Sequence, residues 1–342
     1  MKIAIVTGGS NGIGKATALE LGKRGISVIL TYNSYKDRAE AVVKEIEMNK
    51  VLNEIIDLMK SAGTRPIETG VPGLSMIKGD IPTHQLAALY KPMIGFTVQG
   101  TKILLIGERS TVLKGPSYYV LPVHVPATAS VHPGHDGRPY MSLGLELKQN
   151  VLQSLLRDLP EDLMPTASAN FAACEIDIEL LEAWLRLLRL IKTPRDIPAL
   201  APAYEREILY RVLLGPQGWY LRQLGLRESN FSKISQTANW LRDNYTKPID
   251  IGEIASKSGM AINTFHRQFK RATGLSPIQF QKQLRLLEAR SLIAFEGYAV
   301  ASAAYQVGYQ SPSQFNREYS RFFGAPPARD TEKLRRIERA RD

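Results

Sequence analysis

Cysteine and long apolar runs are nearly absent from this sequence. Its single cysteine, Cys174, excludes an internal disulfide framework and is typical of a reducing compartment. No apolar run reaches the roughly 20 residues that a membrane span needs. The apolar run that precedes Thr7 is too short for a secretory signal peptide. We therefore expect a cytoplasmic protein that does not cross a membrane.

Acidic charge is scarce relative to basic charge. The 342 residues include 44 Lys+Arg and 33 Asp+Glu, a net charge of +11, and residues 231–342 hold 18 of the basic and 10 of the acidic side chains. A basic segment favours a polyanionic partner, because neutralised phosphates release their counterions. The alternative is a solvated basic tail, since five basic residues lie close to the C-terminus: Lys333, Arg335, Arg336, Arg339 and Arg341.

The chain is long enough for two or three domains, and its pattern changes twice. Residues 2–7 predict a buried strand, 14–25 a helix and 28–32 a second strand, and a further helix begins at Asp37. Residues 70–147 contain short β-rich runs between glycine and proline turns, which predict a sandwich or barrel. These runs are Leu74–Lys78, Met93–Gln99, Lys102–Gly107, Ser110–Leu113, Tyr118–Pro122 and Tyr140–Leu147.

From Leu147 onward the spacing of apolar residues becomes helical. The helical stretches include Glu175–Ile191, Ala203–Leu214 and Phe231–Asn244. Three prolines predict a linker between the first two stretches, because proline lacks the N–H that a helix interior uses. They are Pro194, Pro198 and Pro202.

The C-terminal segment contains a repeat. Phe265, Arg267, Phe269, Gly274 and Pro277 recur fifty residues later as Phe315, Arg317, Tyr319, Gly324 and Pro327. Upstream, Ile251, Ala255 and Gly259 correspond to Val300, Ala304 and Gly308 at an offset of forty-nine residues. Each copy predicts a helix, a glycine turn and a second helix, since glycine permits the positive φ of a tight turn. This is the pattern of a helix-turn-helix, whose second helix enters the major groove of DNA.

The segment from Ile234 to about Arg329 resembles the AraC/XylS family of regulators. The residues that carry the resemblance are IGEIASKSGMAINTFHRQFKRATGLSPIQF, the joining helix LRLLEARSLI, and VASAAYQVGYQSPSQFNREYSRFFGAPP. In that family two helix-turn-helix units, joined by a long helix, enter successive major-groove segments on one face of the DNA. After the Pro-Pro step, Ala328 and Arg329 stand where the family has an aromatic-Arg pair, which leaves the last helix open.

The resemblance implies eight DNA-contacting residues, with Phe315 and Phe322 in the core. They are Asn263, Thr264, His266 and Arg267 in the first unit and Ser313, Gln314, Asn316 and Arg317 in the second. Two alternatives stay open. Asn263 or Ser313 could cap a helix instead of reading a base, and Arg267 or Arg317 could bind phosphate instead of guanine.

Residues 48–159 resemble the N-terminal ligand-sensing domain of a subgroup of AraC regulators. The resemblance runs through PGLSMIKGDIPTHQLAALYKPMIGFTVQGTKILLIGERSTVLKGPSYYVLPVHVPATASV and PYMSLGLELKQNVLQSLL. It implies a cupin-like β-sandwich followed by helices, a small-molecule effector and dimerisation. His124, His132 and His135 do not have the His-x-His spacing of cupin metal ligands, so no metal site is expected.

The N-terminus resembles the start of a short-chain dehydrogenase/reductase. VTGGSNGIGKATALELGKRGISVILTYNS places a glycine turn between a strand and a helix, where backbone can approach a pyrophosphate. The resemblance ends at about Glu47, before the later strands and catalytic serine of that family. Tyr32 and Lys36 form a Tyr-x-x-x-Lys pattern, but in a loop where that chemistry cannot occur. Three motif glycines are therefore expected to be vestigial, with no cofactor and no catalytic residue: Gly8, Gly12 and Gly14.

Together these features predict a multidomain α+β protein. We expect a truncated βαβα Rossmann-like fragment in residues 1–47, a cupin-like sandwich with helices in 48–230, an all-α double helix-turn-helix domain in 231–330, and a basic tail in 331–342. The expected function is sequence-specific transcriptional regulation under a small-molecule effector. The expected partners are double-stranded DNA, RNA polymerase and a second copy of the chain. Two alternatives are a regulator that senses NAD(P) through its glycine-rich fragment and a short-chain oxidoreductase.

Overall fold

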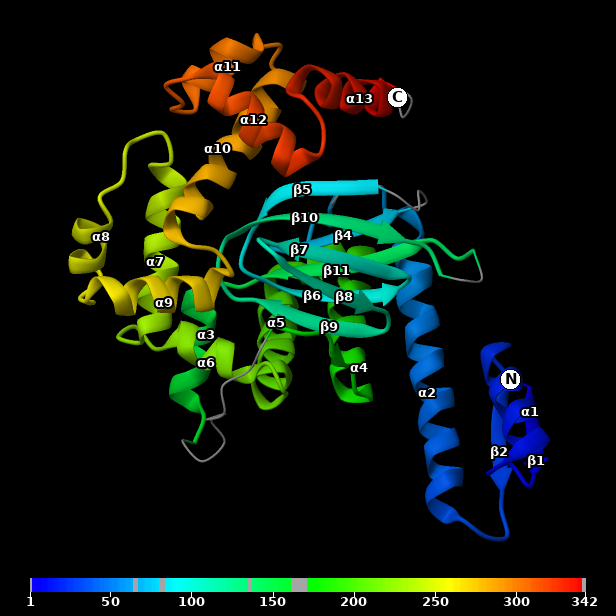
Figure 1. The fold of residues 1–342 in the computed structure, drawn as a ribbon. Coiled ribbons are helices and arrows are strands. Elements are labelled where there is room, and N and C mark those ends of the chain that lie inside the picture. Colours follow the sequence, from blue (N-terminus) through cyan, green and yellow to red (C-terminus); the bar gives the residue numbers. More distant parts are fainter. Residues whose placement is uncertain (1, 64–66, 80–83, 135–136, 161–170, 340–342) are drawn as a thin grey trace.

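The computed structural model describes residues 2–63, 67–79, 84–134, 137–160 and 171–339. Figure 1 shows a small N-terminal unit to one side, a β-sandwich with helices against it, and a helical part that ends at the C-terminus. No helix among these residues is long and apolar enough to span a membrane.

The N-terminal unit has one small layer of strands and one of helices. Strands β1 (Ile3–Thr7) and β2 (Ser27–Thr31) pair in parallel, and α1 (Gly12–Lys23) connects them. Its fully buried core is Val6, Ala18 and Val42, with five partly buried neighbours. Side chains on the other face of the sheet are more than half exposed: Ile3, Ile5 and Ile29. Two strands therefore leave an apolar sheet face without a cover.

Helix α2 (Lys36–Leu58) joins this unit to the sandwich without a break. The sequence predicted a domain boundary between residues 47 and 48, and the structure instead has one helix across that position. Val42 packs toward α1, whereas Ile55 lies in the main core. Arg189 of α4 (Ile178–Arg189) donates two hydrogen bonds of 2.8 Å to the Glu54 carboxylate. The expected boundary at residues 47 and 48 thus lies inside a rigid element, which a short 3-10 turn (Met59–Ser61) follows.

The sandwich contains a four-stranded and a six-stranded sheet. The smaller sheet has the order β5 (His84–Tyr90), β10 (Val125–His132), β7 (Thr101–Ile106) and β8 (Arg109–Lys114). The larger has the order β12 (Cys174–Glu175), β9 (Ser117–Leu121), β6 (Met93–Gln99), β11 (Tyr140–Glu146), β4 (Leu74–Gly79) and β3 (Ile67–Glu68). The six predicted runs are confirmed within one residue at each end.

Helices cover the outer face of the six-stranded sheet. They are α3 (Gln149–Asp158), α4 (Ile178–Arg189) and α5 (Ile197–Leu214), with α6 (Gly218–Gly225) beyond them. Trp184 of α4 is fully buried, and its ring lies 5.8 Å from Phe96 of β6.

The predicted proline linker between α4 and α5 is wrong. Pro194 begins a short 3-10 turn, Pro194–Asp196, and Pro198 lies in the first turn of α5, where no N–H is needed. Pro202 lies inside α5 itself. A second 3-10 turn, Leu190–Lys192, follows α4 directly, so this stretch is almost continuously helical.

The C-terminal part is all helical. Its helices are α7 (Asn230–Asp243), α8 (Ile251–Lys257), α9 (Ile262–Thr273), α10 (Pro277–Ala294), α11 (Val300–Gln306), α12 (Pro312–Phe323) and α13 (Pro327–Arg339). The last of these corrects the expected basic tail. Arg290 pairs with Asp330 of α13 at 2.8 Å, and the Tyr319 hydroxyl donates to the same carboxylate at 2.9 Å. These buried bonds hold α13 against α10 and α12.

Two separate cores divide the helical part. The first helix-turn-helix unit shares the main core with the sandwich, whereas the second unit, α11 and α12, packs a core of its own with α10. Phe231 lies 5.9 Å from the Trp219 ring and 5.8 Å from the Tyr220 ring of α6. A boundary at residue 231 therefore cuts through packed aromatic side chains.

Candidate nucleic-acid interface

The two helical repeats have the same local geometry. Gly259 and Gly308 occupy their turns with φ of 66° and 94°, in the left-handed region that favours glycine. A Cβ at Gly308 would collide with the carbonyl oxygen of Thr246. Asp250 caps α8 by accepting from the N–H groups of Gly252 and Glu253 at 2.7 and 3.1 Å. The cap fixes where α8 begins, and the glycine turn that follows α8 fixes where α9 begins.

Helices α9 and α12 each bury one face and expose the other. Phe265 and Phe269 are fully buried with their ring centroids 5.6 Å apart, and Phe315 and Tyr319 repeat this at 5.4 Å. This confirms the predicted core positions except Phe322, which is partly buried beside the second core. Because residues four apart share a helix face, the intervening residues point away from the core.

The eight predicted DNA-contacting residues lie on the outward side of these helices. Six are exposed: Asn263, Arg267, Ser313, Gln314, Asn316 and Arg317. Thr264 and His266 are half-buried, and the His266 ring meets Phe265 edge-on at 6.2 Å. The structure thus brings four residues to each of two exposed helix faces.

The capping alternative for Asn263 and Ser313 is wrong. The N-cap residues are Ala261 for α9 and Ser311 for α12, and the Ser311 side chain accepts from the Gln314 N–H at 3.4 Å. Asn263 and Ser313 are each the second residue of their helix. Their side chains are therefore available for other contacts.

Among the described residues, Gln314 is the one predicted residue whose side chain forms a hydrogen bond with another side chain. Its amide donates to Glu318 at 3.1 Å, and Lys282 and the Tyr309 hydroxyl donate to the same carboxylate at 2.8 Å each. Burial favours a raised pKa for Glu318, but these three hydrogen bonds lower the pKa below its ordinary value. Glu318 therefore stays ionised and orients Gln314.

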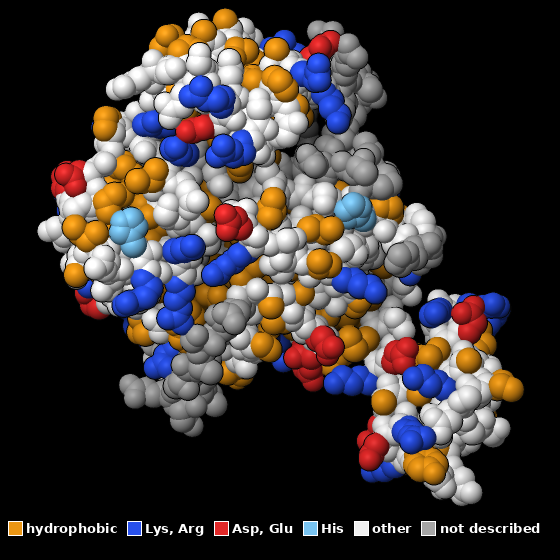
Figure 2. Space-filling view, viewed as in Figure 1, with side chains coloured by type: hydrophobic (Ala, Val, Ile, Leu, Met, Phe, Trp, Pro, Cys, Tyr) orange, Lys and Arg blue, Asp and Glu red, His pale blue; other side chains and the backbone are white. Residues whose placement is uncertain are grey.

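Arg267 and Arg317 have no ion-pair or hydrogen-bond partner among the described residues, and both are exposed. Elsewhere in the protein, several arginines pair with carboxylates, as Arg186 does with Glu207 at 2.6 Å. Figure 2 shows more Lys and Arg than Asp and Glu over the helical part of the molecule. The repeated arginines are thus free cations on a basic surface.

The joining helix α10 holds the two units together through residues that the sequence did not single out. Arg285 donates to the Tyr245 carbonyl at 2.7 Å and to the Gly308 carbonyl at 2.9 Å. Gln281, one turn earlier, donates to the carbonyls of Tyr245 and Lys247 at 2.9 and 2.6 Å. Their i, i+4 spacing on a helix between two repeats was the signal available.

The first unit rests directly on the sandwich. A Cβ at Gly107, in the β7–β8 turn, would lie 2.8 Å from Leu275, and one at Gly274 would lie 2.9 Å from Ile106. Both glycines have positive φ, 60° and 77°. This glycine-to-glycine contact, which we call the junction, places a sandwich turn against the C-terminal end of α9.

A histidine bridges the sandwich and α7. His124 Nδ1 lies 2.8 Å from the Asn239 side-chain oxygen, and Arg242 donates to Nε2 at 3.2 Å. Burial and then the Arg242 charge lower the pKa of His124. His124 is therefore structural and neutral. No group of three or more metal-ligating side chains occurs among the described residues, and His135 lies outside them.

The N-terminal glycine turn has the geometry of a phosphate-approach loop, but little surrounds it. Gly8 and Gly12 have φ of 67° and 52°, and a Cβ at Gly14 would collide with the Gly8 carbonyl oxygen. The sheet beside it has two strands only. Tyr32 and Lys36 lie at the β2–α2 connection, away from any third strand.

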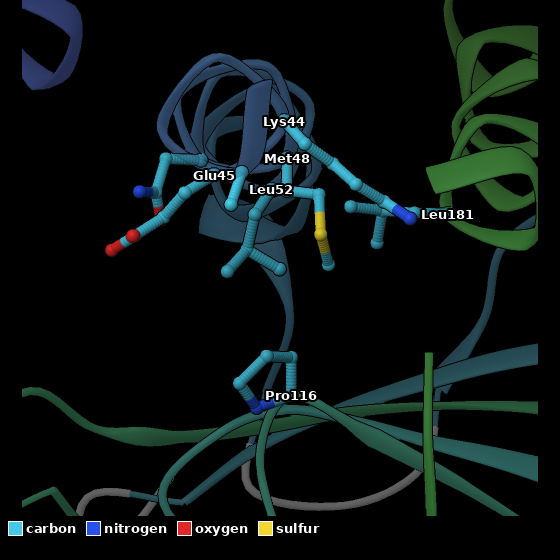
Figure 3. Close-up of a pocket in the computed structure, with 8 residues that line it drawn as sticks. Lys44, Glu45, Met48, Leu52, Pro116 and Leu181 are labelled. Atoms are coloured by element: carbon cyan, nitrogen blue, oxygen red, sulfur yellow. The ribbon is translucent and has the colours of Figure 1, made fainter. Parts of the chain in front are cut away.

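Figure 3 shows the cavity between this unit and the sandwich, of about 320 Å³. Met48 and Leu52 of α2 point toward Pro116, and Leu181 of α4 closes one side. Lys44 and Glu45 lie on the same helix at its edge. The lining is apolar and offers no convergent polar groups.

Three families match different parts of the chain. Residues 70–220 match the AraC-type transcriptional regulator N-terminus, residues 254–333 the helix-turn-helix domain, and residues 2–65 the short chain dehydrogenase family. The last match runs beyond residue 47, where the sequence resemblance was expected to end.

A curated relative matches part of the chain. The HTH-type transcriptional activator RhaS of Salmonella paratyphi B is 33% identical over 135 residues, which is 39% of this chain and 46% of RhaS. The chain therefore matches about half the length of the curated relatives.

Crystal structures of ToxT from Vibrio cholerae have a similar fold. Apo ToxT covers 78% of this chain and 98% of its own, with a TM-score of 0.50 and 12% identity. The 1.65 Å structure covers 75% and 97%, with a TM-score of 0.51 and 10% identity. At these identities the likeness concerns the fold alone: a β-rich N-terminal domain followed by a helical helix-turn-helix domain. The cupin-like and Rossmann-like forms stay predictions.

Proposed function

We propose that this chain is an AraC-type transcriptional regulator that binds a specific DNA sequence under the control of a small-molecule effector. The proposal is supported by the matches of residues 70–220 and 254–333 to the AraC-type N-terminus and the helix-turn-helix domain, which follow a short chain dehydrogenase match. Because its relative RhaS is a transcriptional activator, we propose activation, with RNA polymerase and a second copy of the chain as partners. The protein then works in the cytoplasm, where chromosomal DNA lies.

The observation that carries this proposal is the pair of exposed recognition faces on one support. Helix α9 precedes α10 in the chain and α12 follows it. Arg285 of α10 hydrogen-bonds both the Tyr245 carbonyl in the first unit and the Gly308 carbonyl in the turn of the second. A fixed pair of recognition helices can enter two neighbouring segments of the major groove. A single helix-turn-helix would read only one.

Within each face we assign roles by chemistry. Arg267 and Arg317 are placed to donate in pairs to guanine, the commonest specific contact in the major groove. Asn263 and Asn316 can pair with adenine, and His266 can donate to either a base or phosphate. Gln314 is already aligned by Glu318, so it enters the groove with less rotational freedom to lose.

Effector control follows from the shared core. The first unit packs on the sandwich at the junction, where Gly107 meets Leu275. A change in the sandwich therefore reaches the end of α9 directly, while the second unit keeps a core of its own. We propose that the effector alters the position of the first unit relative to the second.

NAD(P) sensing is a second candidate, favoured by the intact glycine turn at Gly8 and Gly14. The exposed sheet face opposes it, because a dinucleotide site needs a second half to close the crevice. Titration of NADH and NADPH into the full chain tests it. Saturable binding that Gly14→Val abolishes would support this role, and no binding would exclude it. A dehydrogenase would need a catalytic tyrosine beside that crevice, and Tyr32 is not so placed.

The regulator proposal is tested by selecting bound sequences from random duplex DNA with the full chain. The selected DNA should then bind with an affinity whose logarithm falls linearly with the logarithm of salt, by about 0.9 per phosphate contact. Lys114→Met, an exposed change on the outer face of β8, should bind like the natural protein. Selection that enriches no sequence would overturn the proposal.

A further inference from the structure

The two faces of the six-stranded sheet differ in composition. The face under the helices carries large apolar side chains, including Phe96, Val120 and Leu143. The strand register puts several small and polar residues on the other face, toward the four-stranded sheet, together with the apolar Met93 and Leu121. The small and polar residues are Gly95, Thr97, Ser117, Tyr119, Tyr140, Ser142 and Gly144. A sandwich interior built only for stability would be apolar on this face.

A lysine enters this interior from the opposite sheet. Lys102 of β7 is 6% exposed, and its ammonium lies 3.4 Å from the Tyr119 hydroxyl and 4.5 Å from the centre of the Tyr90 ring. No carboxylate of the described residues forms an ion pair with it. Burial alone lowers the pKa of Lys102 to about 8. A buried cation of this kind is costly unless an anion meets it.

Polar groups without partners accompany this lysine. The buried hydroxyls of Thr97, Ser117 and Tyr140 have no hydrogen-bond partner within 3.5 Å in the described structure, and the Tyr140 hydroxyl interacts with those of Ser142 and Thr97 only at longer range. Buried polar atoms are normally paired, so a cluster of unpaired ones points to a function other than packing. Beside them the Tyr119 ring packs directly on Gly95, where no Cβ would fit, and this contact fixes the position of the Tyr119 hydroxyl next to Lys102.

We propose that the interior of the β-sandwich binds a small organic monocarboxylate, with its carboxylate against the Lys102 ammonium and the Tyr119 hydroxyl. The short apolar part of the ligand lies along the small side chains of β10, Ala127 and Ala129. One ammonium and a few neutral donors match a single negative charge. A dianion would leave charge uncompensated, and a neutral polyol would leave the ammonium unpaired. This inference rests on the proposed function, since it gives the effector its chemical class.

The position of Lys102 also connects the ligand to DNA binding. Lys102 and Ile106 lie on the same strand, β7, and Ile106 and Gly107 form the junction with Gly274 and Leu275. A strand is stiff along its length. A bound anion that moves the Lys102 side chain therefore acts on β7, and β7 leads directly into the turn that touches the C-terminal end of α9.

The test is calorimetric titration of the full chain with acetate, butyrate and hexanoate, and with butyramide as the neutral match of butyrate. At least one carboxylate should bind with a stoichiometry of one, and the amide should bind about tenfold more weakly or worse, since a charged hydrogen bond is worth that much. Lys102→Met should lose about the same factor, and Tyr119→Phe should lose part of it. Lys114→Met, on the outer face of the same sheet, should bind as the natural protein does.

Equal binding of butyrate and butyramide, unchanged binding by Lys102→Met, or binding of none of the three acids would overturn the inference. DNA selection on the same preparations separates it from the regulator proposal. Selected DNA without carboxylate binding means that the site is wrong and the function stands. Carboxylate binding at Lys102 without any preferred DNA sequence supports the site and overturns the function.

Discussion

Replacing Lys102 by methionine should stabilise the ligand-free protein. The side chains have similar length, so Lys102→Met removes a buried charge without leaving a large cavity. The fall of the Lys102 pKa from 10.5 to about 8 corresponds to about 3 kcal/mol at pH 7. The lost attraction to the Tyr90 ring offsets about 1 kcal/mol of this. We therefore expect a net gain of about 2 kcal/mol, or about 4–8 °C in the Tm of the sensing domain.

The pH dependence identifies the cause of that gain. Because its pKa is lowered on folding, Lys102 binds more protons in the unfolded than in the native state between about pH 8 and 10.5. The free energy of unfolding of the natural protein should therefore rise with pH across that window. By pH 10 the natural protein should be less stable than Lys102→Met by about 1 kcal/mol or less. Burial raises the pKa of the facing Tyr90, Tyr119 and Tyr140, so these groups stay neutral over the same range.

The assay is thermal unfolding of both proteins at pH 7 and pH 10, followed by near-ultraviolet circular dichroism. Lys114→Met serves as the control for removal of an exposed charge on the same sheet. An unchanged or lower Tm of Lys102→Met at pH 7, or a gain of equal size at both pH values, would refute the reasoning.

Three further predictions concern the helical part and the N-terminus. Asp330→Ala should destabilise the second unit by about 3 kcal/mol, because it leaves the partly buried Arg290 and the buried Tyr319 hydroxyl without their carboxylate partner, and stepwise denaturation by urea would detect this. Stability should fall as the pH drops below 6.5, because His124 resists protonation beside Arg242 with Glu146 and Lys91 nearby; His124→Gln should flatten this slope in acid titration of the melting temperature. A chain that begins at Met48 should bind DNA within about 1 kcal/mol of the full chain, since it keeps Ile55 and the Glu54–Arg189 pair, and collapse of this variant in a gel-shift assay would contradict the assignment.

The sequence was most informative where one pattern repeats. Two copies of helix, glycine turn and helix predicted α8, α9, α11 and α12, because the spacing of Phe265 and Phe269 recurs in Phe315 and Tyr319. Strands with strong β-formers, such as β6 and β7, were also predicted nearly to the residue. Local chemistry decides these elements, so a single sequence suffices.

Strand β10 was missed because its stability is not local. Val125–His132 contains a proline, two alanines and a serine, which are weak strand formers. It nevertheless lies inside its sheet, paired with β5 and β7. Pro126 is tolerated because pairing with β7 begins only at Thr128. Pairing with β5 and β7 makes this segment a strand, and no pattern within its own residues could have predicted it.

The sequence also does not predict that Lys102 points into the sandwich. The run Lys102–Ile106 has almost no polar alternation, so its two faces cannot be told apart from the residues alone. The register with Val131 of β10 and Leu113 of β8 settles which face is buried. The shared core of the first helix-turn-helix unit depends likewise on contacts between segments far apart, such as Gly107 with Leu275.

Specific DNA binding depends most on two recognition helices, α9 and α12, that read neighbouring parts of one DNA face. Hydroxyl-radical footprinting of the full chain on its selected sequence measures this directly. We expect two protected segments about one helical turn, roughly 34 Å, apart on the same face. Arg267→Ala should weaken specific binding by about 1–3 kcal/mol and relax one segment, and Arg317→Ala should do so at the other. A single protected segment, or two arginine variants that bind selected and random DNA in an unchanged ratio, would contradict it.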